Sequence, residues 1–251
     1  MVVSAVGQLV SPVLVFGLGD GALTSTSTET AITPPGWTFV VWGLICLLSL
    51  AYALDQRPGR HPALSPVLDR LARPLTWVFV LYSVWLAVAE LDVVWLTVVL
   101  FATMLVGLLR AARIAMTSRP LARSRGTRVL LAWLLGTYTG WTSVAVFVNL
   151  SAAIRQQGAP VDSLAGLSWQ ALLLVAAVAL ASLVTYRWHA SWPYVLTVLW
   201  ALAGAATATY QRDARPLSLL CAAGIVAVLV VAWLTRSGRL AGSERVGLPA
   251  S

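Results

Sequence analysis

Residues 36–54 of this chain are 19 consecutive amino acids without a charge, directly after two adjacent prolines, Pro34 and Pro35. As a helix they would extend about 28 Å, close to the thickness of the hydrocarbon core of a bilayer. Proline lacks an amide donor and its ring crowds the preceding turn, so a double proline fits ahead of a helix but not within one. The stretch therefore predicts a membrane-spanning helix with a stiff entrance, carrying Trp37 and, further in, Trp42.

Similar apolar runs recur along the chain. Hydrophobic residues make up 59% of the sequence and charged residues 10%, whereas about a quarter of a soluble domain is charged. This composition excludes an ordinary soluble protein and predicts an all-α fold, a polytopic bundle of eight transmembrane helices. The first span is the weakest because it contains Pro12, and residues 24–33, rich in Ser and Thr, are expected to form an exposed loop. The expected spans are residues 2–23, 36–54, 74–109 as a pair, 129–149, 168–186, 194–211 and 216–235.

Residues 74–109 are too long for one span. A single helix would be about 54 Å long, against roughly 30 Å of hydrocarbon. The only charges are Glu90 and Asp92, in the middle of the run. Carboxylates at bilayer depth would mark a functional site, whereas at the tip of a hairpin water solvates them. Their position favours a turn with one span on either side.

All 17 basic residues are arginine, and the net charge is +8. The arginines flank apolar runs, which favours membrane orientation and contact with anionic headgroups over nucleic-acid binding. With eight spans, all but Arg155, Arg212 and Arg215 fall on one side, mostly in the polar connectors 55–73 and 110–128. Both termini are therefore expected in the cytoplasm, with the segment before Pro34 on the outer side. Without the weak first span, only the N-terminus would change side.

Tryptophan is unusually frequent, with 12 residues. Five lie near predicted helix ends, where indole prefers the membrane interface: Trp37, Trp169, Trp188, Trp192 and Trp233. Four lie deeper: Trp42, Trp85, Trp141 and Trp200. Interior indoles either fill a core or line a pocket, where they stack on a flat apolar ligand and donate one hydrogen bond. The sequence leaves both interpretations open.

The span at residues 129–149 has the most informative pattern. Thr137, Trp141, Ala145 and Asn149 recur every four residues, with Tyr138 one position aside. Such residues share one face of a helix. The face is a contact between helices, with Ala145 permitting close approach and Asn149 hydrogen-bonding a neighbour, or a pocket wall; the two are compatible, and spacing alone does not separate them. In residues 194–211, the small residues Ala201, Gly204, Ala205 and Ala208 indicate helix packing.

No constellation for catalysis is evident within the predicted spans. His61 and His189 have no second ligand at metal spacing. Cys46 and Cys221 both fall within spans, where lone thiols are typical packing residues. No nucleophile with a base and no phosphate-binding glycine loop appears. We therefore expect no enzyme activity, no metal and no resident cofactor.

Several of these residues together resemble the TspO/MBR family, the tryptophan-rich sensory or translocator proteins related to the peripheral benzodiazepine receptor. The resemblance rests on Pro34-Pro35, Phe39, Val41-Trp42, Tyr138, Trp141, Ala145 and Asn149, and covers about residues 2–153. Thr137 stands where the family has proline, and Tyr82 stands where an Asn-x-x-Trp motif ending at Trp85 would place asparagine. The step from Phe39 to Trp42 is one residue shorter than in short members.

The resemblance implies a five-helix core, residues 1–153, that binds a flat apolar ligand near the first loop. Residues 154–235 resemble the three-helix extension of longer bacterial members, followed by a polar cytoplasmic tail, 236–251. It further implies a multi-pass protein of the bacterial inner membrane, with a porphyrin or haem-like tetrapyrrole as the usual ligand, and leaves a homodimer open. By matching position, the resemblance implies these ligand-binding residues: Trp37, Phe39, Trp42, Tyr138, Trp141, Ala145 and Asn149. Trp85, one of the deeper indoles, completes the expected site.

Three functions are compatible with this reading. The first is binding of a tetrapyrrole-like ligand for sensing or transport, with the Pro34-Pro35 loop as a lid. The second is a membrane enzyme that modifies or photodegrades a porphyrin, a route based on tryptophan that needs no acid–base set. The third is a structural or assembly protein without a small-molecule ligand, in which the three extra helices dock a partner.

Overall fold

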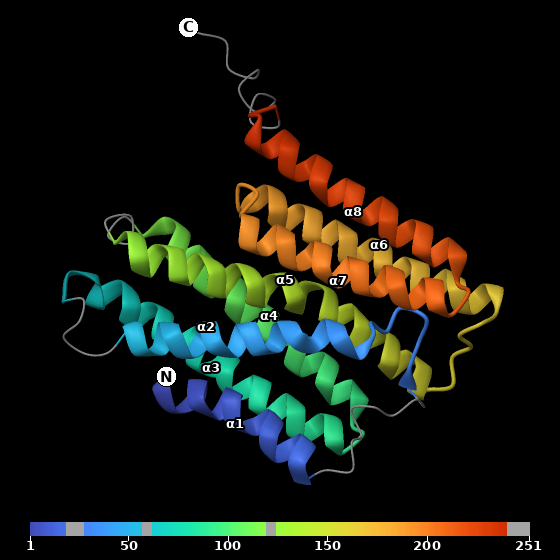
Figure 1. Ribbon diagram of the computed structural model, residues 1–251, viewed down its shortest axis with the longest axis horizontal. Coiled ribbons are helices and arrows are strands. Elements are labelled where there is room, and N and C mark those ends of the chain that lie inside the picture. Colours follow the sequence, from blue (N-terminus) through green and yellow to red (C-terminus); the bar gives the residue numbers. More distant parts are fainter. Residues whose placement is uncertain (19–27, 57–61, 119–123, 240–251) are drawn as a thin grey trace, which may run out of the picture.

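The structure, a computed structural model, describes residues 1–18, 28–56, 62–118 and 124–239. Within these ranges the fold is all-α, as predicted, and has eight α-helices (Figure 1). They are α1 (Val2–Leu18), α2 (Val41–Asp55), α3 (Ser65–Glu90), α4 (Val94–Thr117), α5 (Arg125–Gln156), α6 (Leu164–Arg187), α7 (Trp192–Gln211) and α8 (Arg215–Arg236). Two 3-10 helices, η3 (Gly36–Val40) and η4 (Pro62–Leu64), precede α2 and α3.

Seven segments in the described part of the chain are long and apolar enough to cross a membrane: η3 with α2, and each of α3 to α8. The helix α1 has 17 residues and contains Pro12, which makes it the weakest candidate, as the sequence predicts. Residues 19–23 of that predicted span lie outside the described residues. The protein is therefore a multi-pass membrane protein.

Several helices run beyond the predicted apolar stretches. α3 begins at Ser65 rather than at Pro74, and α5 runs from Arg125 to Gln156 rather than over residues 129–149. The connectors predicted at 55–73 and 110–128 were therefore too long. Arginine is a good helix former, and its long side chain keeps the charge in water while its stem lies along apolar surface. A change in polarity thus does not end the helix.

The predicted hairpin at Glu90 and Asp92 is confirmed. Glu90 is the last residue of α3, and Asp92 is exposed in the turn before α4, with φ of 54°. The amide of Gln156, at the end of α5, donates to the carbonyl of Asp92 at 2.9 Å. Both acids therefore lie at a helix junction rather than halfway along a span.

Helix α5 belongs to two closed rings of helices. In the first ring, α1 packs against α2 and α3, α4 joins α3 to α5, and α5 packs back against α2. In the second, α5 packs against α6 and α7, and both of these pack against α8. Figure 1 accordingly shows α5 between the N-terminal helices and the C-terminal three. The boundary predicted after residue 153 lies within the last turn of α5.

The contact between α5 and α7 depends on two glycines four residues apart. A Cβ at Gly136 would lie 2.7 Å from Cβ of Pro193, and one at Gly140 would lie 2.9 Å from Cβ of Thr197. Real Cβ atoms do not approach other atoms so closely. This is the small-xxx-small spacing by which membrane helices approach closely. The close contact of α5 with α7 therefore joins the second ring to the first.

Residues 30–32 are not part of an exposed loop, contrary to the prediction. Thr30, Ala31 and Ile32 are all buried. The hydroxyl of Thr30 hydrogen-bonds that of Ser151 on α5 at 2.9 Å, and the amide of Ala31 donates to the side-chain carbonyl of Gln170 on α6 at 2.8 Å. The Ser and Thr content suggested solvent exposure because partners on distant helices cannot be identified from the sequence.

Candidate functional site

The entrance to α2 has the order that the double proline predicts. Pro35 is extended, with φ of −64° and ψ of 154°, and η3 follows immediately. The hydroxyl of Thr38 donates back to the carbonyl of Pro35 at 2.6 Å. The first turn is a 3-10 helix rather than an α-helix, and α2 begins at Val41. This brings Phe39 and Trp42 to the same region of the first ring.

Trp42 is the centre of a cluster of aromatic rings drawn from four helices. Its ring centroid lies 4.6 Å from that of Tyr82, 5.6 Å from Trp85 and 6.3 Å from Trp141. It also contacts Phe101 and Tyr138, at 6.3 and 5.6 Å. Offset, tilted or edge-to-face rings at these separations attract one another beyond their area burial. The cluster is thus a rigid wall as well as a core.

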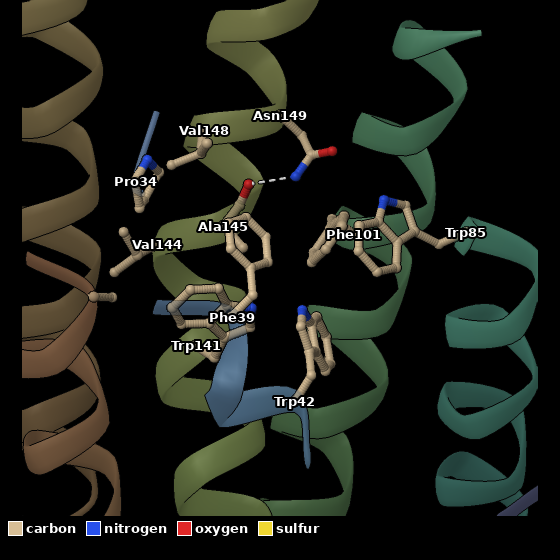
Figure 2. Close-up of a pocket in the computed structure, with 11 residues that line it drawn as sticks. Pro34, Phe39, Trp42, Trp85, Phe101, Trp141, Val144, Ala145, Val148 and Asn149 are labelled. Atoms are coloured by element: carbon tan, nitrogen blue, oxygen red, sulfur yellow. Dashed lines mark hydrogen bonds between the residues drawn. The ribbon is translucent and has the colours of Figure 1, made fainter. Parts of the chain in front are cut away.

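A small cavity lies between this cluster and the entrance (Figure 2). Its volume is about 30 Å³, which is the share of one water molecule in the liquid. Eleven residues line it: Pro34, Phe39, Trp42, Trp85, Phe101, Trp141, Val144, Ala145, Val148, Asn149 and Ala201. In Figure 2 the indoles of Trp42 and Trp141 lie below Ala145, and the ring of Phe39 lies at its level. The site is therefore almost filled by its own side chains.

Three of the indoles that line the cavity carry unused hydrogen-bond donors. The ring N–H groups of Trp42, Trp85 and Trp141 are buried and have no acceptor in the part of the chain that the structure describes. An unsatisfied buried donor costs about 1–3 kcal/mol. A molecule that offers an acceptor to these groups would recover part of that cost, so the cavity is chemically suited to a ligand with polar atoms on an apolar body.

The polar end of the cavity is formed by Asn149. Its amide nitrogen donates to the carbonyl of Ala145, one turn earlier in α5, at 2.9 Å (Figure 2). The amide nitrogen thus bonds its own helix, and in the described part of the chain no hydrogen bond from Asn149 to a neighbouring helix is found. Ala145, Asn149 and Trp141 share one face of α5, as their spacing predicts, and all three line the cavity.

The structure brings together six of the eight residues predicted for the site. Phe39, Trp42, Trp85, Trp141, Ala145 and Asn149 all line the cavity. Tyr138 is fully buried behind Trp42 and accepts a hydrogen bond from the amide of Gln8 at 2.9 Å, so it supports the wall without lining it. Trp37 is half-exposed and packs edge-on against Trp200, at 5.1 Å between centroids, outside the lining.

Four further residues line the cavity although the sequence pattern did not indicate them: Phe101, Val144, Val148 and Ala201. Val144 and Val148 flank Ala145 and Asn149 at helical spacing, so the α5 stripe could have included them. Phe101 was assigned no role because one phenylalanine in an apolar helix carries no positional signal. Ala201 was assigned to helix packing, and its position on the cavity shows that α7 also contributes to this site.

Helix α7 also holds the entrance segment in place. The indole N–H of Trp200 donates to the carbonyl of Thr38 at 3.0 Å. A Cβ at Gly204 would lie 2.5 Å from the methyl group of Thr38, so the backbone of α7 directly abuts η3. At the end of α7, Arg212 donates to the carbonyl of Thr33 at 3.0 Å and pairs with Glu29 at 2.8 Å.

Metal-binding chemistry is not indicated in the described ranges, since they contain no group of three or more His, Cys, Asp or Glu side chains that could hold an ion. The indole N–H groups at the cavity are hydrogen-bond donors only and do not coordinate metals. The lining thus offers aromatic faces and indole N–H donors.

These features define a class: a multi-pass α-helical membrane protein whose aromatic cluster is covered by the segment of residues 34–40, which begins with two prolines. A family model described as TSPO-like protein matches residues 1–235, and the chain belongs to this family. The match continues through α8, so it includes the three C-terminal helices as well as the first ring. No curated protein and no solved structure matches the chain.

Proposed function

We propose that this protein binds a flat, largely apolar molecule of the tetrapyrrole type in the aromatic cavity, for sensing or transport. The observation that carries the proposal is that three indoles lining one aromatic cavity have buried N–H groups with no acceptor in the described part of the chain. A porphyrin has a flat apolar ring for stacking and carboxylate groups that accept hydrogen bonds. Membership of the TSPO-like family, which generally comprises binding and transport proteins, supports the same reading.

Binding requires the cavity to enlarge. Ligand sites typically have volumes of about 300–1,000 Å³, against about 30 Å³ here. The segment best suited to move is η3 with Phe39, because a 3-10 helix has poorer hydrogen-bond geometry than an α-helix and Phe39 and Trp37 are already half-exposed. We therefore propose that residues 34–40 act as a lid, which α7 holds closed until a ligand displaces it.

Quenching of indole fluorescence by protoporphyrin tests the proposal. We expect saturable quenching of the purified protein in detergent. Trp141→Phe retains a ring but removes one donor, and should weaken binding about tenfold, as expected for one charge-assisted hydrogen bond. The matched control is Trp233→Phe, which removes an exposed indole on α8 and should leave the affinity unchanged.

Two outcomes would redirect the assignment. A folded protein that shows no saturable quenching would contradict ligand binding and favour the structural or assembly role, for which the small volume of the cavity is the supporting observation. Loss of porphyrin absorbance with a new product on illumination of the complex would instead favour the enzyme that degrades porphyrin. Saturable binding without product supports binding for sensing or transport.

A further inference from the structure

A second and larger cavity lies toward the N-terminal end of α5, where residues between 128 and 136 line it, whereas residues between 141 and 149 line the aromatic cavity. It has a volume of about 310 Å³ and lies between the last turns of α4, the first turns of α5 and the turn from α6 to α7. We refer to it as the α4–α5 crevice. Its volume is at the lower end of the range for ligand sites, and no part of the proposed lid or aromatic cluster lines it.

The crevice is apolar inside and polar at its rim. Its apolar lining comes from Ala112, Ala115, Met116, Leu131, Leu135 and Trp188. Its polar lining comes from Arg128, Ser118 and Ser191, which lie in the first turn of α5, directly after α4 and directly before α7. An elongated molecule with an apolar body and a charged head matches this division, whereas a uniformly polar solute does not.

The helix ends around the crevice are strongly basic. Arg110 and Arg113 on α4, Arg125 and Arg128 on α5, and Arg187 on α6 are all exposed at this end. The described residues of these turns include no carboxylate. The nearby carboxylate of Asp55, on α2, accepts a hydrogen bond from Thr127 at 2.8 Å. The guanidinium of Arg128 has no ion-pair partner among the described residues, so its charge is available to an anion.

The α6–α7 turn is held rigidly enough to form one side of a site. Arg236 on α8 donates to the carbonyl of Ala190 at 2.8 Å, and its guanidinium lies 4.5 Å from the ring centre of Trp192. Trp188 packs against Tyr194, with 5.3 Å between ring centroids. The half-buried indole of Trp188 therefore has a fixed position at the edge of the crevice, where indoles commonly contact lipid at the headgroup level.

We propose that the α4–α5 crevice binds an anionic phospholipid, with one acyl chain along the apolar lining and the phosphate at Arg128. The argument is charge complementarity: an apolar slot between membrane helices opens beside Arg128, which has no ion-pair partner among the described residues, as in basic pockets that bind anionic headgroups. The arginine distribution predicts that this end faces the cytoplasmic leaflet, in which anionic lipids are available.

Native mass spectrometry of the delipidated protein, titrated with phosphatidylglycerol or phosphatidylcholine, tests this proposal. We expect the unmodified protein to retain one phosphatidylglycerol in preference to phosphatidylcholine. Arg128→Gln should reduce that preference about fivefold, the effect of one arginine near an anionic membrane surface. Arg187→Gln is the matched control, because it removes a charge from the same end without touching the crevice, and should preserve the preference.

A second pair of variants tests the apolar part of the site. Ala132→Phe places a ring at the crevice wall and should reduce retention of both lipids, whereas Val129→Phe adds the same ring on α5 outside the lining and should not. Equal retention of the two lipids by the unmodified protein, or equal losses with Arg128→Gln and Arg187→Gln, would overturn the proposal. So would a dimer in the spectrum that only Ala132→Phe disrupts, because a second copy would then occupy the crevice.

Discussion

Adding a single methyl group at Gly204 should open the proposed lid. The Cβ of Gly204→Ala would lie 2.5 Å from the methyl group of Thr38 and 3.4 Å from Cβ of Pro34. Thr38 cannot easily rotate away, because its hydroxyl is hydrogen-bonded to the carbonyl of Pro35 at 2.6 Å. The methyl group therefore strains the closed position of η3 and leaves an open position unstrained.

Overpacking of this kind typically costs about 1–3 kcal/mol, which corresponds to a shift in a two-state equilibrium of about 5- to 150-fold. If only the open state admits a ligand, its apparent affinity rises in proportion to the open fraction. We expect Gly204→Ala to bind protoporphyrin about tenfold more tightly, with a faster association rate in stopped-flow quenching. The unfolding temperature should fall at the same time.

Gly224→Ala is a matched control for this experiment. Its Cβ would lie 2.5 Å from a methyl group of Val178, so the steric conflict is equal but lies between α8 and α6, away from the lid. It should lower the unfolding temperature without raising the affinity. A readout without ligand is maleimide labelling of Ala145→Cys, since Cys46 and Cys221 are both buried. Labelling should be faster when Gly204→Ala is present.

One result would show that η3 is not a lid. If Gly204→Ala loses as much thermal stability as Gly224→Ala while its affinity and labelling rate stay at their original values, the strain is absorbed within α7 and η3 is not a lid. A decrease in affinity would be equally damaging, because it would mean that the closed position of η3 forms part of the bound state.

Further predictions concern the contacts between the two rings. Arg212→Gln removes the exposed ion pair with Glu29, so it should lower the free energy of unfolding by less than about 1 kcal/mol and raise ligand affinity slightly. If added salt speeds ligand association in the unmodified protein, this variant should no longer show that effect in stopped-flow quenching. Gly140→Ala should destabilise the fold by about 1–3 kcal/mol in denaturation by SDS, because its Cβ meets Thr197 of α7. Gly43→Ala, with nothing within 4 Å of the new Cβ, should be neutral or slightly stabilising in that assay, and an equal loss at both positions would contradict the packing argument.

The sequence predicted those parts of the site that depend on periodicity within one helix. Trp141, Ala145 and Asn149 share a face because an α-helix repeats every 3.6 residues, and the uncharged run after Pro35 had to become a span. Glu90 and Asp92 were placed at a turn from length alone. These inferences need only local geometry and the thickness of the membrane.

The remaining parts depend on which helices become neighbours, which the sequence pattern does not encode. Phe101 and Ala201 look like ordinary apolar residues until α4 and α7 are placed on either side of the cavity. Residues 30–32 were expected in solvent because their buried partners, Ser151 and Gln170, lie more than a hundred residues further along the chain. The polar flanks of α3 and α5 were expected to end the helices, although arginine side chains allow the helices to continue.

The position of α5 in both rings has a consequence for the order in which the protein assembles. During synthesis the first four helices emerge with one side of their ring open, and the emergence of α5 completes it. At that moment Gly136 and Gly140 present a shallow groove to lipid, which remains uncovered until α7 has been made and inserted. The second ring thus assembles on a surface that the first ring has already fixed. A ribosome that stalls between α5 and α7 would leave an intermediate in which the Gly136 and Gly140 face of α5 is exposed to the bilayer.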